Sequence, residues 1–280
     1  MPAPAALAAD DRQAGHRPLG LRLLAFASEQ SLQAETHLGR EGEGLHEGVH
    51  EARKCIRRIR ATLALGAQAL GPRAKRLDAE LRRLCHGLSH LRNAQALLEA
   101  LARLDGTVPP AVQAILPGVE RIARERRDHL LARALARDPI FAARRRRLWI
   151  VHEHLARLDW QSIDAAAVSE AVNRSKRRTR KAMKKALKNR DDELAWHTCR
   201  RRIRRLRQQD TLLSGLQPDL SPAMHGLAGR ADALGESQDY ALLLRCCGKR
   251  SPFGIAQRTL LRRVARERLQ HLRASQASGA

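Results

Sequence analysis

The chain has 280 residues, of which 43% are hydrophobic and only 2% are aromatic, and its 53 Lys and Arg against 29 Asp and Glu give a net charge of +24. This length and hydrophobic content allow a sizeable core, which has to be built from aliphatic side chains. The Leu- and Ala-rich composition, poor in β-branched residues, favours an all-α protein, and the charge favours polyanionic partners such as nucleic acid, an anionic membrane surface or a phosphate polymer.

Cysteine usage and hydropathy argue against a secreted or membrane-spanning protein. The five cysteines are odd in number and lack metal-ligand spacing, so we expect buried free thiols, no metal and no cofactor. No stretch approaches the roughly 20 apolar residues of a membrane span, and the N-terminus has acids where a signal peptide needs bases. We therefore expect a cytoplasmic protein.

Gly and Pro clusters divide the chain into helical lengths. Residues 1–17 and 275–280 are expected to be disordered tails. The predicted helices between these tails cover residues 19–38, 46–70, 73–104, 111–137, 141–158, 163–190, 192–215, 222–247 and 253–274. Apolar residues recur at three- and four-residue spacing in most of them, as helices packed in bundles require.

An internal repeat organises these helices. The stretch "VHEARKCIRRIR" (49–60) is repeated as "WHTCRRRIRRLR" (196–207), with His50 aligned on His197. Two later matches keep the same order, one pairing Asn93 with Asp239 and the other pairing residues 121–130 with residues 263–272. The order predicts a duplicated unit, with one four-helix bundle and a connector in 18–160 and a second bundle in 161–274.

The repeated stretch carries its cations on one side of a helix. Because a helix turns about 100° per residue, the basic residues of the first copy share an arc of roughly 160°, opposite Ala52, Ile56 and Ile59. The two arcs consist of His50, Arg53, Lys54, Arg57, Arg58 and Arg60, and of His197, Arg200, Arg201, Arg204, Arg205 and Arg207. Like charges one turn apart destabilise a helix by about 0.2–0.5 kcal/mol each, so two such arcs indicate a bound anion that compensates them.

Arginine favours phosphate as that anion, because its planar fork grips phosphate oxygens in pairs. Cations one turn apart would form a rail for a linear polyanion. A solvated basic face is the alternative. His50 and His197 are either core or capping residues, or neutral donors to phosphate, since nearby cations disfavour the charged ring. The repeated His129 and His271 leave packing and binding equally open.

A third basic element, "NRSKRRTRKAMKKALKNR", covers residues 173–190 and has no equally basic counterpart in the first half. We expect its cations to extend the polyanion surface on the second bundle, although a disordered basic arm is an alternative. The candidate binding residues here are Arg177, Lys181, Lys184, Lys185 and Lys188.

The doubled pattern H-x-x-[RK]-[KR]-x-x-R-R-[IL]-R resembles that of the CHAD family, the conserved histidine α-helical domain. The resemblance covers residues 18–274 and implies two four-helix bundles related by a pseudo-two-fold axis, with a basic groove that binds inorganic polyphosphate. It also implies that the two basic arcs are the binding positions. The usual third-helix R-D pair stands here as Arg92–Asn93 and Gln238–Asp239, so each half keeps one member.

The resemblance therefore predicts a non-catalytic polyphosphate-binding module that associates with polyphosphate granules. The alternative is a general polyanion or nucleic-acid-binding protein that uses backbone phosphates, although the few aromatic residues are not interleaved with the bases. An enzyme is disfavoured, because the basic arcs almost lack carboxylates to hold a divalent metal and no G-x-x-x-x-G-K loop occurs. The E-x-E-x-K signature of the catalytic CYTH domain, a common fusion partner in the family, is also lacking, since "EGEGL" has no lysine.

Overall fold

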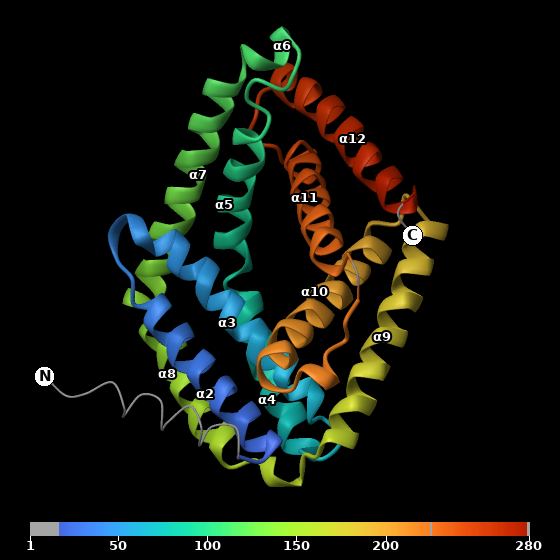
Figure 1. Ribbon diagram of the computed structural model, residues 1–280. Helices are drawn as coiled ribbons and strands as arrows, with labels where there is room; N and C mark the ends of the chain where they lie inside the picture. Colours follow the sequence, from blue (N-terminus) through green and yellow to red (C-terminus); the bar gives the residue numbers. More distant parts are fainter. Residues whose placement is uncertain (1–16, 225, 279–280) are drawn as a thin grey trace, which may run out of the picture.

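The structure, a computed structural model, describes residues 17–224 and 226–278, and every regular element in these ranges is a helix (Figure 1). This confirms the predicted all-α class. The α-helices are α2 (Leu19–Leu38), α3 (Leu45–Leu65), α4 (Gly71–Gly87), α5 (Ser89–Ala102), α6 (Pro110–Gln113), α7 (Leu116–Arg137), α8 (Ala142–Ala156), α9 (Ala165–Lys188), α10 (Glu193–Leu216), α11 (Leu227–Cys246) and α12 (Ile255–Ser278). The short 3-10 helices are η1 (Gly42–Gly44), η2 (Pro139–Phe141), η3 (Trp160–Ser162) and η4 (Pro218–Leu220).

The helices pack in pairs that follow the order of the sequence repeat. Helix α2 packs on α3 and α9 on α10, while α5 packs on α7 and α11 on α12. The two halves meet where α3 packs on α10 and α5 on α11, in the middle of the molecule (Figure 1). Both His–Arg helices are therefore central. The pseudo-two-fold relation of the halves stays a prediction.

A close approach fixes α3 against α2. The backbone of α3 at Gly48 lies so near the end of α2 that a Cβ there would be 2.2 Å from the carbonyl oxygen of His37. Only a residue without a Cβ fits at such a distance, so the glycine permits the contact. This contact lies at the start of the helix that carries the first basic arc.

Buried side chains form three clusters of aliphatic residues. The first joins α2, α3, α4 and α8 to the start of α9 and the end of α10, and the second joins α5, α6, α7, α11 and α12. The third joins α9, the start of α10 and α11. The first two clusters combine residues from both sides of the boundary predicted at 160/161, and the third lies wholly after it. This boundary therefore does not divide the hydrophobic core. The division into two bundles stays a prediction.

Several predicted helix limits are wrong. The predicted helix 73–104 is two helices, α4 and α5, because the helix is interrupted at Leu88 between Gly87 and Ser89. Helix α3 ends at Leu65, before Gly66, instead of at residue 70, and α11 begins at Leu227 instead of at residue 222.

The predicted tails lie mostly outside the described residues. Residues 1–16 and 279–280 lie outside the described residues. Helix α12 continues through Ser278 and so passes the limit predicted at 274. In the described part of the chain, no helix combines the length and apolar character needed to cross a membrane.

Candidate functional site

The two basic arcs face away from the core, as their spacing predicts. In α3, the buried residues Ala52, Ile56 and Ile59 hold the helix against the first cluster. In α10, Cys199, Ile203 and Leu206 do the same in the third cluster. The start of α10 is capped by Asp192, whose Oδ1 accepts hydrogen bonds from the backbone N–H groups of residues 194 and 195 at 2.9 and 3.0 Å.

Where α3 and α10 pack together, a group of arginines gathers that we call the arginine cluster. Its members are Arg53, Arg57, Arg92, Arg200 and Arg204. They come from α3, α5 and α10, and each lies close enough to others of the group to feel their charge. Helix α11 passes close to the cluster at Gly235, where a Cβ would lie 3.8 Å from Nη2 of Arg200.

At the centre of the cluster, Arg57 and Arg204 are largely buried. Burial, followed by the charge of Arg204, lowers the pKa of Arg57, and burial with the charge of Arg200 lowers that of Arg204 to about 10. Neither side chain donates a hydrogen bond or forms an ion pair within the described residues. Guanidinium keeps its proton at neutral pH, so the site holds adjacent buried cations.

Three N–H groups of the cluster are buried without a partner in the described structure. They are Nε of Arg53, Nε of Arg57 and Nη1 of Arg92. Such donors are costly to bury, and so are charges that lack a counter-ion. The cluster is therefore a site that an anion with several oxygen acceptors would stabilise.

Two members of the cluster are oriented by hydrogen bonds to acceptors outside it. Arg53 donates to neutral groups, and Arg92 donates to a carboxylate. Nη1 of Arg53 donates to the carbonyl oxygen of Cys85 and, at 3.0 Å, to Oγ of Ser89, at the interruption between α4 and α5. Nη2 of Arg92 donates to Oε2 of Glu99 at 2.8 Å. Nε of Arg53 and Nη1 of Arg92 have no acceptor in the described residues.

Asp239 is an acid whose charge acts on Arg200. Its Oδ2 accepts a hydrogen bond of 2.8 Å from Nη2 of Arg103, which links α5 to α11. Burial raises the pKa of Asp239, while the charges of Arg103 and Arg200 oppose the shift. The retained Asp of the second R-D pair thus sits at the edge of the cluster, and its counterpart Asn93 is exposed.

The two motif histidines have different surroundings. The side chain of His50 is 35% exposed, and burial together with Arg92 lowers its pKa to about 4, so its ring is neutral at pH 7. A neutral ring is what the sequence predicts beside so many cations, and its role as a donor to phosphate stays a prediction. His197 is exposed, and its Nδ1 lies 3.1 Å from Oε1 of Gln238. His129 and His271 are exposed on α7 and α12.

Four of the predicted binding residues are engaged elsewhere, so the structure does not bring them into the cluster. Lys54 pairs with Glu51 at 2.8 Å, Arg58 donates to Gln30 at 3.0 Å, Arg60 pairs with Asp78 at 2.8 Å and Arg207 pairs with Asp232 at 2.5 Å. An arc of roughly 160° is wider than the contact between two helices, which explains the difference.

The remaining predicted residues lie outside the cluster as well. Arg201 is exposed and Arg205 faces a separate pocket. The cations predicted on α9 are all exposed along that helix, namely Arg177, Lys181, Lys184, Lys185 and Lys188. Helix α9 itself is well formed, so the alternative of a disordered arm is wrong.

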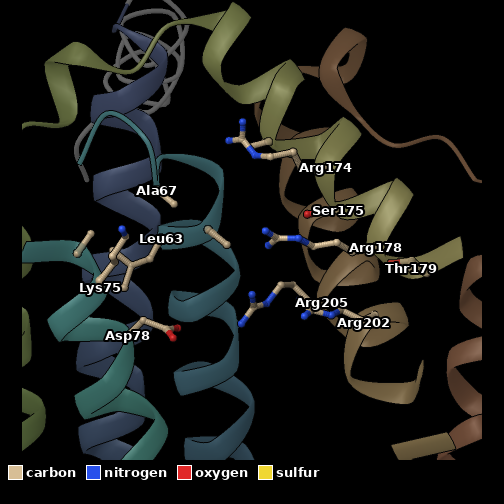
Figure 2. A pocket seen from close by; sticks show the side chains of 13 residues that line it. Leu63, Ala67, Lys75, Asp78, Arg174, Ser175, Arg178, Thr179, Arg202 and Arg205 are labelled. Carbon is tan, nitrogen blue, oxygen red and sulfur yellow. The ribbon is translucent and has the colours of Figure 1, made fainter. Parts of the chain in front are cut away.

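The separate pocket, which we call the side pocket, encloses about 330 Å³ between α3 and α4 on one side and α9 and α10 on the other (Figure 2). Its lining residues are Leu63, Ala64, Ala67, Ala74, Lys75, Asp78, Ala171, Arg174, Ser175, Arg178, Thr179, Arg202 and Arg205. Burial lowers the pKa of Arg205 to about 10.

Sequence reasoning missed several residues of these sites. The sequence pattern identifies Arg92 of the cluster only as half of the R-D pair, and it does not identify four residues of the side pocket, Lys75, Arg174, Arg178 and Arg202. The signal for Arg174 and Arg178 was present, because they lie one turn apart on the face of α9 that also carries Lys181 and Lys185.

Comparisons with known proteins agree with this fold. A family model of the CHAD domain matches residues 24–248. Among solved structures, PptA from Streptomyces chartreusis is similar, with 20% identity, a TM-score of 0.64, and coverage of 94% of this chain and 99% of that chain. The CHAD domain from the plant Ricinus communis is also similar, with 21% identity, a TM-score of 0.58, and coverage of 93% and 87%. No curated protein matches the chain. Because the family model covers most of the sequence and both His–Arg helices, the protein belongs to the CHAD family.

Proposed function

We propose that this CHAD protein binds inorganic polyphosphate in the arginine cluster and does not catalyse a reaction on it. One observation carries the proposal: Arg57 and Arg204 are largely buried beside other arginines and have no acidic partner in the described chain. Buried charges cost several kcal/mol unless a counter-charge compensates them. A polyanion threaded between α3 and α10 would supply that counter-charge.

The spacing of the cluster supports a linear anion. Arg53 and Arg57 lie four residues apart on α3, as do Arg200 and Arg204 on α10, which corresponds to about 6 Å along each helix. Successive phosphate units of one chain would meet successive guanidinium groups. Their oxygens would accept from the buried Nε atoms of Arg53 and Arg57.

The chemistry of the cluster supports polyphosphate over single-stranded nucleic acid. Base recognition needs aromatic side chains on which bases stack, and the chain has only three Trp, three Phe and one Tyr. The five residues of the cluster are all arginines, which recognise phosphate oxygens. Nonspecific binding of duplex DNA through its backbone is the competing outcome.

The acids around the cluster support binding without catalysis. Glu99 is bonded to Arg92 and Asp239 to Arg103, so these carboxylates are already engaged by cations.

We propose that the protein acts as a polyphosphate-binding module on polyphosphate granules. Fluorescence microscopy of the tagged protein with stained granules tests this location, and a diffuse signal in cells that contain granules would contradict it.

A competition titration tests the binding proposal. Labelled long-chain polyphosphate is bound to the protein and challenged with duplex DNA, RNA and heparin at matched charge concentration over a series of salt concentrations. We expect polyphosphate to stay bound at salt concentrations that release the other polymers. Equal displacement by all competitors would show a general polyanion surface instead.

A matched pair of variants locates the binding. The double variant Arg57→Gln/Arg204→Gln removes two charges from the cluster, and Arg263→Gln/Arg266→Gln removes two exposed charges from α12. We expect the first pair to lose at least about a hundredfold in affinity, since each charge-assisted contact contributes roughly 1.5–3 kcal/mol. Equal losses in both variants would place the binding outside the cluster. Release of free phosphate by the wild type, followed over hours, would contradict the non-catalytic part.

A further inference from the structure

The side pocket differs from the arginine cluster because apolar and cationic residues both line it. Its apolar wall consists mainly of small side chains from α3, α4 and the turn after α3, namely Leu63, Ala64, Ala67 and Ala74, with Ala171 of α9. The other wall consists of cations from α9 and α10, which point across the pocket in Figure 2. An inorganic polymer has no apolar surface to place against the first wall.

The cationic wall is free to bind a phosphate group. Arg178, Arg202 and Arg205 form no hydrogen bond or ion pair within the described residues, and a further cation, Lys75 of α4, lies across the pocket beside Leu63 (Figure 2). The hydroxyl-bearing residues Ser175 and Thr179 lie on the same side.

The acid in the pocket is already neutralised. Asp78 accepts two hydrogen bonds from Arg60, from Nε at 2.8 Å and from Nη2 at 3.1 Å. Its negative charge also acts on Arg205, but it is one carboxylate against the four arginines and one lysine that line the pocket. A phosphate facing those arginines would meet a site of net positive charge.

One of the lining residues, Arg174, carries an oriented guanidinium group. Nη1 of Arg174 donates to Oε1 of Gln68 at 3.1 Å and also to Glu170, so its side chain is fixed and its charge is compensated. An arginine held in this way is suited to stack on a planar ring.

We propose that the side pocket binds an organic phosphate of nucleotide size, with the phosphates on Arg178, Arg202 and Arg205 and the organic part between Arg174 and the alanine wall. The volume of about 330 Å³ lies at the lower end of the roughly 300–1,000 Å³ typical of small-molecule sites, as expected for a ligand no larger than a single nucleotide. The apolar wall gives the ester its advantage over inorganic phosphate. This site is separate from the proposed polyphosphate site.

The experiment uses a fluorescent nucleotide, mant-ATP, whose anisotropy reports binding to the full chain. Unlabelled ATP, inorganic tripolyphosphate and adenosine then compete with it. We expect ATP to displace the probe at concentrations at least about tenfold lower than tripolyphosphate, which corresponds to about 1.4 kcal/mol. Adenosine should compete weakly. Tripolyphosphate that competes as well as ATP would overturn the proposal, because the apolar wall would then contribute nothing.

Two kinds of variant assign the binding to the pocket. Ala67→Leu fills the space beside the apolar wall without changing the charge, and Ala64→Leu is a second filling variant in case the first fails to fold, as judged by circular dichroism. Either variant should weaken ATP at least about tenfold and leave tripolyphosphate unchanged. Arg178→Gln/Arg202→Gln should weaken both ligands. Unchanged ATP affinity in a folded filling variant would refute the assignment.

The outcome is independent of the polyphosphate proposal. Arg57→Gln/Arg204→Gln should retain mant-ATP binding while losing long-chain polyphosphate, and Ala67→Leu should show the reverse. Loss of mant-ATP in the cluster variant would mean that the nucleotide occupies the arginine cluster, which would overturn the inference of a separate site.

Discussion

Arg57 of α3 and Arg204 of α10 are both largely buried where the two halves of the protein meet. Burial and the charges of neighbouring arginines lower the pKa of both side chains. Neither side chain has an acidic partner in the described residues. This relationship opposes folding, since two like charges leave water at the same place. The protein thus keeps at its centre an arrangement that is unfavourable until an anion arrives.

Arg57→Met should therefore stabilise the free protein. Replacing a buried charge by an apolar side chain of similar length removes both desolvation and repulsion, and we expect a gain on the order of 1–2 kcal/mol in the free energy of unfolding. Urea denaturation without polyanion measures it, and the exposed Arg263→Met should change the free energy by less than about 0.5 kcal/mol. A loss of stability in Arg57→Met would show that the guanidinium has a structural partner.

The same pair tests whether one polymer crosses both helices. If Arg57 and Arg204 hold one chain, the losses of binding free energy in Arg57→Gln and Arg204→Gln should not add, and the double variant should deviate from their sum by at least about 0.5 kcal/mol. Calorimetric titration with long-chain polyphosphate gives the three values. Additive losses would indicate that α3 and α10 bind independently.

The salt dependence of the affinity for polyphosphate should show how many arginines contact the polymer. Each phosphate contact releases counter-ions, so removal of one contacting arginine should lower the slope of log K against log salt by about 1. We expect this reduction for Arg53→Gln and for Arg200→Gln in affinity measurements at four or more salt concentrations. Arg207→Gln, which removes a residue paired with Asp232, should leave the slope nearly unchanged.

His50 predicts a loss of stability in acid. Its pKa falls from 6.5 to about 4 in the folded chain, mainly through burial, so between pH 6.5 and 4 the unfolded chain binds more protons. Stability should therefore fall as the pH decreases through this range, and His50→Gln should flatten the dependence. Thermal melts at half-unit pH steps measure the difference. An identical slope in the variant would show that His50 is not the group responsible.

Gly48 should tolerate no side chain. A Cβ would lie 2.2 Å from the His37 carbonyl oxygen, so Gly48→Val has to separate α2 from α3 and should cost at least about 1–3 kcal/mol. Gly229→Val on α11 has open space around its Cβ and is a control for helix propensity alone. Equal losses in both variants would mean that the close approach is easily relieved.

Part of this organisation was predictable from local pattern. The limits of α2 follow from Pro18 and Gly39, and the inward faces of α3 and α10 follow from the spacing of Ile56, Ile59 and Ile203. Helical periodicity states which side of a helix is apolar, so it predicts the basic arcs correctly.

The remainder depends on how helices distant in sequence cross. Periodicity cannot tell which part of a wide arc meets another helix, so Lys54 and Arg58 could not be separated from Arg53 and Arg57. The interruption at Leu88 has a local signal in Gly87, because glycine is a poor helix former, whereas Ser89 begins α5 without capping it. Apolar residues keep their helical spacing across Leu88, and this continuous pattern conceals the interruption. The side pocket needs four helices at once and has no local signal.

The interruption at Leu88 has one consequence for the electrostatics of the site. It leaves the last carbonyl groups of α4 without helical partners, and one of them, that of Cys85, accepts from Arg53. The negative end of a helix macrodipole amounts to about half an elementary charge, and it is built into the backbone. The protein thus steadies a buried cation with a fixed dipole that no anionic polymer can displace and that leaves most of the positive charge in place. A carboxylate at the same position would compete with the ligand for that charge.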